Sequence, residues 1–319
     1  MKNNLLTVII PTYNTRNYLE RCLNSVTNQS LKEIEIIIVD DNSTDGTSEI
    51  IQKYVKQFSN ITYYHNSENL GPGGARNVGL KFVKTKYVCF LDSDDWVDTG
   101  MYKKAIHMLE TNCSCDITIC GIKTEFDNPY CVKNRYQYKD ANIITNEFAL
   151  SLLCKTENQD ISISSLLGNK VFRTKLIKEH NIFFERLYFE DELFSFLAIL
   201  NANKIALLPD VYLHYYQRQS SIMHSFSRKY IDDTLEIFLI LKKYLEEKSI
   251  FCIYQSYYYA FFMRCYFSLM NVLFSSEQNL DVQRKYLLYF ANSFEENFNL
   301  TDVIHYMDIN VLKRIFLID

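Results

Sequence analysis

Short runs of apolar and aromatic residues alternate with helical patterns in the first hundred residues of the chain. Four of these runs have the length of strands, and they lie at residues 5–10, 34–39, 61–64 and 87–91. Between them, apolar residues at helical spacing predict helices at residues 16–28, 44–58 and 75–83. Apolar strands separated by helices are typical of a parallel sheet covered on both faces. The pattern therefore predicts an α/β fold for this part.

Beyond residue 100 the pattern is mixed, and beyond residue 228 it is helical. The middle predicts a strand at 116–123, strands at 204–207 and 211–216 around Pro209, and helices at 146–154 and from Glu190 onward. The chain has only 8 Gly and 4 Pro, and the last of each are Gly168 and Pro209. A stretch without these residues favours helices. We expect them at residues 230–246, 250–273, 282–294 and 301–315.

Polar segments follow three of the predicted strands. They are Pro11-Thr12-Tyr13, Asp40-Asp41 and Asp92-Ser93-Asp94-Asp95. Parallel strands end at a common edge of their sheet, and ligands of such sheets bind beyond the carboxyl ends of the strands. The three segments therefore predict a binding site at one edge, and their convergence is stronger evidence than any one segment.

Charge and cysteine content narrow the class of protein. A net charge of −4 provides no basic surface of the kind that nucleic acids need, so no nucleic-acid partner is expected. The 9 Cys have irregular spacing, and we interpret them as buried apolar residues in a reducing compartment. The apolar run at residues 5–10 is too short for a signal peptide, and no window reaches the roughly 18 uncharged residues of a membrane span. These features predict a cytoplasmic protein.

The acidic segment Asp92–Asp95 has the composition of a metal site. Carboxylates this close repel one another unless a cation is present, and Mg²⁺ or Mn²⁺ prefers oxygen ligands that it shares with the phosphates of a substrate. Such an ion would neutralise a diphosphate leaving group. The alternative is that these acids only stabilise the start of the next helix.

Four ordered motifs identify a family that the chain resembles. They are IIPTYN at residues 9–14, VDDNSTDGT at 39–47, NLGPGGARNVGL at 69–80 and FLDSDDW at 90–96. Together they resemble the inverting family 2 glycosyltransferases with the GT-A fold. The resemblance continues more loosely through NKVFRTKLI at 169–177, FEDELF at 189–194 and YYQRQSSIMHS at 215–225.

The resemblance implies a fold and a division of the chain. The GT-A fold is Rossmann-like, with a mostly parallel central sheet flanked by helices. We expect a GT-A domain at residues 1–225, with a nucleotide-sugar binding half at 1–100 and an acceptor-side half at 101–225. An all-α C-terminal region would occupy residues 226–319.

The resemblance also implies which residues bind a UDP-sugar donor. Uracil and ribose would contact the segment Pro11, Thr12, Tyr13 and the pair Asp40, Asp41. Asn69 and Arg76 would complete the nucleotide pocket, and Ser93 would also bind the nucleotide-sugar. Asp92 would contact the ribose or the metal, and Asp94 would coordinate Mn²⁺ or Mg²⁺ on the diphosphate. Arg218, Ser221 and His224 would reach over the diphosphate. The residues themselves leave open a simple turn at Gly71–Gly74 and a solvated loop role for His224.

Inverting transfer needs one carboxylate that takes the proton of the acceptor hydroxyl. In FEDELF the family places this general base at the second acid, which is Asp191 here. The alternative is that Glu190, Asp191 and Glu192 only stabilise the N-terminus of their helix.

The predicted function is therefore metal-assisted, single-displacement transfer of a sugar, of the hexosyl or N-acetylhexosaminyl type, from a UDP-sugar to an acceptor hydroxyl. The acceptor would be a saccharide, a lipid-linked chain or a protein, as in the synthesis of surface polysaccharide, teichoic acid, glycolipid or glycoprotein. A nucleotidyltransferase is disfavoured because no Gly-rich, Arg-containing loop follows the first strand. A degenerate partner subunit that binds a nucleotide or another transferase is the remaining alternative, and Asp92, Asp94 and Asp191 argue against it.

Residues 250–273 carry a dense set of Tyr and Phe side chains. Such a stripe favours packing in a core or at a homo-oligomer interface. Peripheral contact with the inner face of the membrane is the alternative, although helices at a membrane surface are usually rich in Lys and Arg, and this one has only Arg264.

Overall fold

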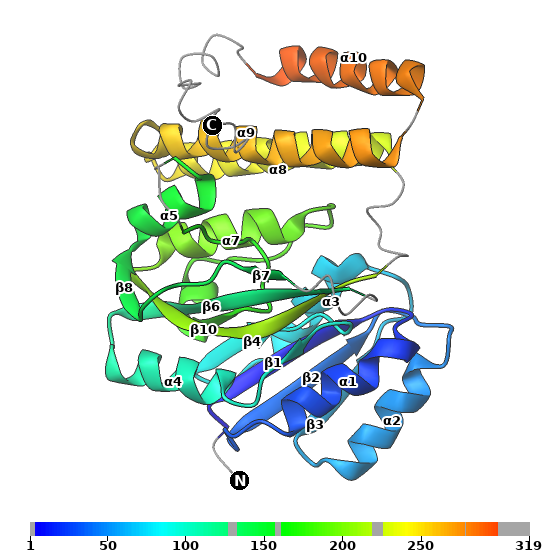
Figure 1. Ribbon diagram of the computed structural model, residues 1–319, viewed down its shortest axis with the longest axis vertical. Coiled ribbons are helices and arrows are strands. Elements are labelled where there is room, and N and C mark those ends of the chain that lie inside the picture. Colours follow the sequence, from blue (N-terminus) through cyan, green and yellow to red (C-terminus); the bar gives the residue numbers. More distant parts are fainter. Residues whose placement is uncertain (1–3, 127–132, 157–160, 219–225, 278, 299–319) are drawn as a thin grey trace. The chain divides into compact units, whose positions relative to one another are not determined.

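The computed structural model describes residues 4–126, 133–156, 161–218, 226–277 and 279–298 (Figure 1). Contacts divide the chain into two compact units. The sheet unit comprises residues 1–149, 164–186 and 190–217, and the helical unit comprises residues 150–163, 187–189 and 218–319. The helix expected at 301–315 and the domain boundary expected at residue 225 lie outside the described residues, so both stay predictions.

The first half of the sheet unit is built as the apolar runs predict. Its parallel strands lie in the order β3-β2-β1-β4 and are β1 (Leu6–Thr12), β2 (Ile34–Asp40), β3 (Ile61–His65) and β4 (Tyr87–Phe90). Every residue of β1 is buried, which explains why the run is apolar on both faces of the strand. The connecting helices are α1 (Arg16–Thr27), α2 (Thr47–Gln57) and α3 (Gly71–Phe82). The right-hand part of Figure 1 shows α1 and α2 side by side.

Helix α3 begins four residues before the position that the apolar pattern indicates. Gly71 has a φ of +77°, which a side chain would disfavour, and Pro72 follows in the first turn. The helix then packs closely on the sheet, because a Cβ at Gly79 would lie 2.6 Å from Cγ2 of Ile9.

The other half of the sheet unit is mixed. Strand β9 (Lys170–Arg173) pairs antiparallel with both β4 and β6 (Cys115–Phe126), and β10 (Lys204–Gln217) runs parallel to β6. Three shorter strands complete the sheet. Strands β5 (Trp96–Val97) and β8 (Asn142–Thr145) pair antiparallel with β10, and β7 (Lys133–Arg135) pairs antiparallel with β6. The helices of this half are α4 (Met101–Thr111), α6 (Thr174–Glu179) and α7 (Glu190–Asn201). Helix α5 (Asn146–Cys154) begins in the sheet unit and passes into the helical unit at residue 150.

The separate strands expected at 204–207 and 211–216 form the single strand β10. Its pairing with β6 shifts in register between Leu207 and Val211. Pro209 lies in this irregular stretch, where its missing N–H breaks no regular pair, so proline interrupts the register rather than the strand.

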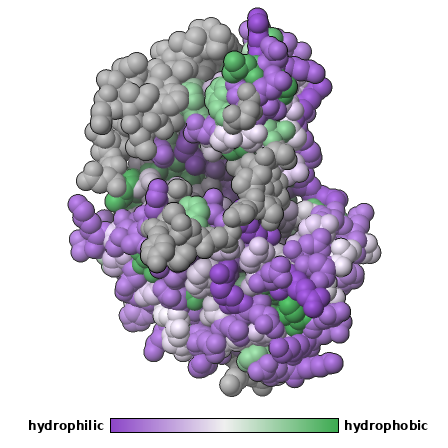
Figure 2. All heavy atoms as spheres, turned by 45° about the vertical axis from the view of Figure 1, so that its right-hand side comes forward, coloured by the Kyte–Doolittle hydropathy of each residue, from purple (hydrophilic) through white to green (hydrophobic). Residues whose placement is uncertain are grey.

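The helical unit contains α8 (Arg228–Glu247), α9 (Phe251–Ser276) and α10 (Leu280–Asn297). The aromatic stripe of α9 packs against α8, where the ring of Phe238 contacts Tyr258, Phe261 and Phe262 at centroid distances of 4.8–5.7 Å. Within the described part of the chain, no helix is long and apolar enough to cross a membrane. Figure 2 shows a largely hydrophilic face with small, separate hydrophobic patches. Homo-oligomer formation and membrane contact through these helices stay predictions.

The contact between α3 and β1 predicts that Gly79→Ala destabilises the protein. The added methyl group would overlap the buried side chain of Ile9, and overpacking of this kind costs about 1–3 kcal/mol. The higher helix propensity of alanine offsets at most about 1 kcal/mol of this cost. Urea unfolding measures the difference. Gly100→Ala is the matched control, because its Cβ would have no neighbour closer than 3.5 Å, and equal stability of the two variants would contradict the prediction.

Candidate active site

The three polar segments meet at one edge of the sheet. Strand β1 lies between β2 and β4, and Thr12 is in register with Asp40. The backbone N–H of Asp41 donates to the carbonyl oxygen of Thr12 at 2.8 Å, and that of Leu91 donates to the carbonyl oxygen of Ile9 at 3.0 Å. The parallel strands therefore bring these segments together, as the sequence predicts.

Asp40 and Asp41 are buried, and both carboxylates accept hydrogen bonds from the protein. Asp40 accepts from the backbone N–H of Ser43 at 3.0 Å and from the hydroxyl of Tyr63 at 3.1 Å. Burial, followed by the charge of Asp40, raises the pKa of Tyr63 to about 12, so its hydroxyl keeps the proton that it donates.

The carboxylate of Asp41 accepts from the side chain of Asn66 at 2.8 Å and from the backbone N–H of Leu70 at 2.9 Å. The pair thus shapes the loops that follow β2 and β3. Contact of either carboxylate with a nucleotide stays a prediction.

The other predicted nucleotide residues differ in exposure. Pro11 and Thr12 are buried, whereas 48% of the surface of Tyr13 is exposed. Asn69 is exposed, and its side-chain oxygen accepts from the backbone N–H of Gly71 at 2.9 Å, which fixes the start of α3. Tyr13 and Asn69 are therefore the members of this set that are exposed to solvent.

The segment Asp92–Asp95 is a tight turn held by neighbouring elements. The backbone N–H of Asp95 donates to the carbonyl oxygen of Asp92 at 3.0 Å. The buried carboxylate of Asp95 accepts from the backbone N–H of Tyr216 at 2.9 Å, and Ser93 is buried beside it. Arg21 donates to the carbonyl oxygen of Asp94 at 3.0 Å. The carboxylates of Asp92 and Asp94 remain partly exposed at the surface of this turn.

A buried arginine joins this turn to the start of α7. The guanidinium of Arg76, on α3, donates to Asp92 at 2.6 Å and to Glu190 at 2.5 Å. Only 4% of Arg76 is exposed. Burial lowers the pKa of the guanidinium, but the charges of Asp92 and Glu190 more than offset this effect, so the pKa is raised and Arg76 stays charged. Three motifs that are distant in the sequence therefore share one network of charges.

The sequence pattern missed the role of Glu190 in this network. It predicts Glu190 only as an acid at the N-terminus of a helix, whereas the structure shows it buried and paired with Arg76. A short motif cannot show that Glu190 pairs with Arg76, which lies more than a hundred residues away in the sequence. The one local hint of a role for Glu190 is that this ionisable residue directly precedes the predicted base.

Asp191, the predicted base, is the second residue of α7, next to this network, and is partly exposed. Burial, followed by the negative charges of Glu192 and Glu190, raises the pKa of Asp191 from 3.8 to about 8, and Arg76 only partly opposes this shift. A carboxyl group whose pKa lies near neutral pH is suited to accept a proton during a reaction.

Tyr215 is a further residue beside the acids that the sequence did not single out. Burial, followed by the charges of Asp95, Asp92, Asp94 and Asp191, raises its pKa, so its hydroxyl is neutral and able to donate a hydrogen bond. Arg218 lies just beyond β10 and is partly buried. Ser221 and His224 lie outside the described residues, so their predicted roles are untested.

The acidic turn could hold a metal ion only together with a bound ligand that supplies further oxygen atoms to the ion. Among the described residues, no three His, Cys, Asp or Glu side chains are grouped to hold a metal ion. Mg²⁺ and Mn²⁺ are commonly held by one or two carboxylates together with substrate phosphates. Arg76 engages Asp92 and the backbone of Tyr216 engages Asp95, and Asp94 is the carboxylate that the family resemblance assigns to the metal. This donor set suits a metal–diphosphate complex and not a site made by the protein alone.

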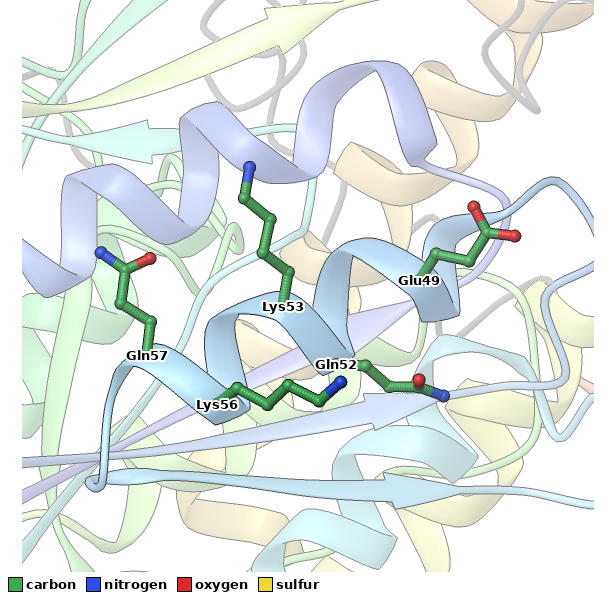
Figure 3. Close-up of a pocket in the computed structure, with 5 residues that line it drawn as sticks. All are labelled: Glu49, Gln52, Lys53, Lys56 and Gln57. Carbon is green, nitrogen blue, oxygen red and sulfur yellow. The ribbon is translucent and has the colours of Figure 1, made fainter.

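A surface hollow lies on α2 and is separate from these acids. It is lined by Glu49, Gln52, Lys53, Lys56 and Gln57, and Figure 3 shows that all five side chains project from that one helix. The hollow is open and contains none of the predicted site residues, so we do not consider it a candidate active site.

Comparison with known proteins identifies the class of protein that has this fold and this candidate active site. The model of the family "Glycosyl transferase family 2" matches residues 7–178, which is more than half of the chain. The chain belongs to this family, and the expectation of a family 2 glycosyltransferase with the GT-A fold is confirmed.

Two bacterial relatives illustrate the similarity. The chain is 28% identical over 254 residues to the putative glycosyltransferase EpsH of Bacillus subtilis (strain 168), covering 78% of this chain and 71% of EpsH. It is 35% identical over 212 residues to the poly(ribitol-phosphate) beta-N-acetylglucosaminyltransferase TarS of Staphylococcus aureus (strain Mu50 / ATCC 700699). That match covers 65% of this chain but only 35% of TarS, so the chain spans about a third of that relative.

Crystal structures of S. aureus TarS 1–349 resemble the chain over most of its length. One has a TM-score of 0.67 at 26% identity and covers 96% of this chain and 82% of that one. The complex of the same fragment with UDP-GlcNAc has a TM-score of 0.61 at 25% identity and covers 98% and 81%. The sheet unit and the helical unit therefore both have counterparts in a solved glycosyltransferase.

The Arg76 network predicts a large loss of stability in Arg76→Met. Removing one partner of a buried ion pair leaves an uncompensated charge and costs about 3–5 kcal/mol. Glu190 would become such an uncompensated charge, because only 9% of its side-chain surface is exposed to water. Arg16→Met is the control, since the pair Arg16–Glu49 is exposed and should contribute about 0–1 kcal/mol. Chemical denaturation measures the free energy of unfolding of both variants. Similar losses of stability in the two would contradict the assigned role of Arg76.

The raised pKa of Asp191 predicts that Asp191→Asn stabilises the protein in a pH-dependent way. The folded protein keeps the Asp191 proton up to about pH 8, whereas the unfolded chain loses it near pH 3.8. The wild-type free energy of unfolding therefore loses a contribution as the pH rises through this window, and asparagine does not ionise. The advantage of the variant should be absent below pH 3.8 and grow until about pH 8. Urea titrations across this range test it, and a variant no more stable than wild type at pH 8 would contradict it.

Proposed function

We propose that the protein transfers a sugar, with inversion, from a UDP-sugar to an acceptor hydroxyl, with Asp191 as the general base. One observation supports this proposal above the others. The guanidinium of Arg76 bonds both Asp92 and Glu190, so the proposed donor side and the proposed base belong to one charged network. In a single displacement the attacking hydroxyl and the leaving group lie on opposite sides of one anomeric carbon, so the base and the donor side must be held in a fixed relation.

The chemistry assigned to Asp191 is proton removal. The oxygen of the acceptor hydroxyl bonds to the anomeric carbon, the bond from that carbon to the UDP oxygen breaks, and the acceptor proton passes to the carboxylate. UDP leaves with the bonding electron pair. The raised pKa of Asp191 supports this role because a higher proton affinity makes the carboxylate a stronger base.

The donor side is proposed to comprise the strand ends at Pro11–Tyr13 and Asp40–Asp41, together with Asn69, Arg76 and the turn from Asp92. The exposed ring of Tyr13 suits stacking on a base, and Arg218 suits contact with the diphosphate. Asp94 would hold Mn²⁺ or Mg²⁺ together with the diphosphate, and the ion would neutralise charge on the leaving UDP. The TarS complex with UDP-GlcNAc supports a UDP-sugar donor. Residues 1–100 would form the donor half and residues 101–225 the acceptor half.

The acceptor is proposed to be a cell-surface polymer or its precursor. The name of TarS specifies transfer to poly(ribitol phosphate), which makes a polyol-phosphate chain the first acceptor to test. A lipid-linked saccharide or a protein is the alternative acceptor. The non-catalytic alternative, a partner subunit that only binds a nucleotide, is disfavoured because Asp92, Asp94 and Asp191 are all present.

The test is a donor panel with wild-type protein and three variants. UDP release from UDP-GlcNAc and other UDP-sugars is measured with Mn²⁺ or Mg²⁺, and with poly(ribitol phosphate) or water as acceptor. We expect metal-dependent release that rises with pH as Asp191 ionises. Asp191→Asn should lower kcat by roughly 10²–10⁴, since a positioned base contributes about this factor. Asp94→Ala should raise the metal concentration that half-maximal release requires.

Glu192→Gln is the matched control for the base assignment. It removes an adjacent acid from the same helical turn, so release should persist while the acidic limb of the pH profile moves to lower pH, because Glu192 raises the pKa of Asp191. Near-wild-type release by folded Asp191→Asn would show that the base is another residue. Absence of release from every donor, with and without acceptor, would favour the partner-subunit alternative.

A further inference from the structure

One face of helix α1 lies along the acidic turn and the short strand β5 that follows it. Three residues of α1, and Gln29 just beyond its end, form hydrogen bonds with the backbone of residues 92–98. Arg21 and Cys22 donate to the carbonyl oxygens of Asp94 and Asp92 at 3.0 and 3.6 Å, Ser25 accepts from the N–H of Val97 at 3.3 Å, and Gln29 donates to the carbonyl oxygen of Asp98 at 2.8 Å. All of these residues belong to the sheet unit. The backbone of the turn is therefore supported by α1 within one compact unit.

Arg21 differs from the other three residues because aromatic rings hold its guanidinium. Its Cζ atom lies 3.7 Å from the centroid of the Trp96 ring and 4.5 Å from that of Tyr216. A guanidinium is attracted to the face of an aromatic ring, and its planar shape suits stacking. Arg21 is otherwise exposed to solvent. The two rings therefore keep an exposed side chain in the position from which it reaches the carbonyl oxygen of Asp94.

The ring of Trp96 is itself held by strand β10. Trp96 and His214 are cross-strand partners, and their rings stack at 4.8 Å with an interplanar angle of 17°. The two nitrogens of the His214 ring lie 2.8 Å from a carboxylate oxygen of Glu125 and 3.2 Å from one of Asp98. The imidazole is thus anchored at both nitrogens. The stack of Arg21, Trp96 and His214 therefore connects strands β6 and β10 to the acidic turn.

Asp94 is the residue of the turn on which this stack acts. Two other hydrogen bonds already close the turn, because the N–H of Asp95 donates to the carbonyl oxygen of Asp92 and the carboxylate of Asp95 accepts from the backbone of Tyr216. The hydrogen bond from Arg21 adds a restraint on the peptide group between Asp94 and Asp95. The rotamers open to a side chain depend on the backbone torsions of its own residue. A restraint on this peptide group therefore also limits where the Asp94 carboxylate points.

Electrostatics alone would give Arg21 the opposite effect on a metal site. Like charges repel, so a guanidinium beside the turn weakens the attraction of its carboxylates for Mn²⁺ or Mg²⁺. The geometric effect has the other sign. Mg²⁺ demands near-ideal octahedral geometry, so a carboxylate that is already in place binds it more tightly than one that must first be ordered. Removing Arg21 therefore distinguishes the two effects by the direction in which metal affinity changes.

We propose that Arg21, held on the ring of Trp96, is a positioning residue that fixes the acidic turn so that the Asp94 carboxylate is pre-organised for the ion of the metal–diphosphate complex. The inference rests on the proposed function, because it needs Asp94 to bind that ion. It extends the candidate site to α1, a helix in which the sequence pattern indicates no site residue.

The test is a titration with Mn²⁺ at saturating UDP, in which electron paramagnetic resonance measures the free ion. In Arg21→Ala the Kd for Mn²⁺ should rise about 10-fold, or about 1.4 kcal/mol, because the ion must then order the turn itself. The Kd for UDP in EDTA, measured by calorimetry, should stay within about twofold, since no proposed nucleotide residue is changed. Urea unfolding should be close to that of wild type, because Arg21 is exposed.

Two further variants separate position from charge. Trp96→Leu removes the ring that holds Arg21 but leaves every charge in place, so it should also weaken Mn²⁺ binding. Lys53→Ala is the matched control, because it removes an exposed cation from α2, and it should leave the Kd for Mn²⁺ unchanged. If Trp96→Leu is unstable, Arg21→Ala decides the question alone.

Three results would overturn the inference. The first is unchanged or tighter Mn²⁺ binding in Arg21→Ala, which would leave only the electrostatic effect. The second is a wild-type Kd for Mn²⁺ in folded Trp96→Leu. The third is an equal loss of UDP affinity with and without the metal, since that would indicate general damage to the nucleotide site.

A double variant separates this inference from the proposed function. In an Asp94→Ala background, Arg21→Ala should cause no further loss of Mn²⁺ affinity, because residues that act through one group are not additive. An additional loss in that background would show that Arg21 does not act through Asp94. If Asp94→Ala alone binds Mn²⁺ as wild type does, the proposed metal site fails and this inference fails with it. If Asp94→Ala is impaired and Arg21→Ala is not, only the inference fails.

Discussion

Arg76 carries a positive charge into the interior of the sheet unit, where the carboxylates of Asp92 and Glu190 neutralise it. Removing the charged groups of Arg76 and Glu190 from water costs several kcal/mol each, and the attraction among the ions offsets that cost only while the short hydrogen bonds are kept. The acidic turn that starts at Asp92 and the helix that starts at Glu190 are therefore not free to separate. The geometry of the candidate site depends on this constraint, because each carboxylate comes from a different element and the arginine contacts both.

The raised pKa of Asp191 has a different main cause. Burial raises it most, followed by the negative charges of Glu192 and Glu190, and the positive charge of Arg76 opposes this shift only in part. Asp191 therefore holds its proton to a higher pH than an exposed aspartate does. This arrangement has a cost and a benefit for catalysis. A smaller fraction of the protein carries the ionised base at neutral pH, but each ionised base has a greater affinity for the acceptor proton.

The parallel half of the fold could be predicted because its strands are buried on both faces and read as unbroken apolar runs, as β1 does. Strand β9 could not, because its residues 170–173 include Lys170 and Arg173. Lys170 is fully buried, and its ammonium is stabilised by the carbonyl oxygens of Ser164 and Leu166, which no hydrophobic pattern reveals. The site shows the same limit. Motifs identify Arg76 and Asp191 as candidates, but the partnership of Arg76 with Glu190 arises only when the chain folds.

The family model ends at residue 178, before Asp191. The proposed donor residues from Pro11 to Asp94 thus lie within the matched region, and the proposed base lies beyond it. Donor binding makes similar demands on every enzyme that uses a nucleotide sugar, whereas the base must be placed relative to an acceptor that differs between enzymes.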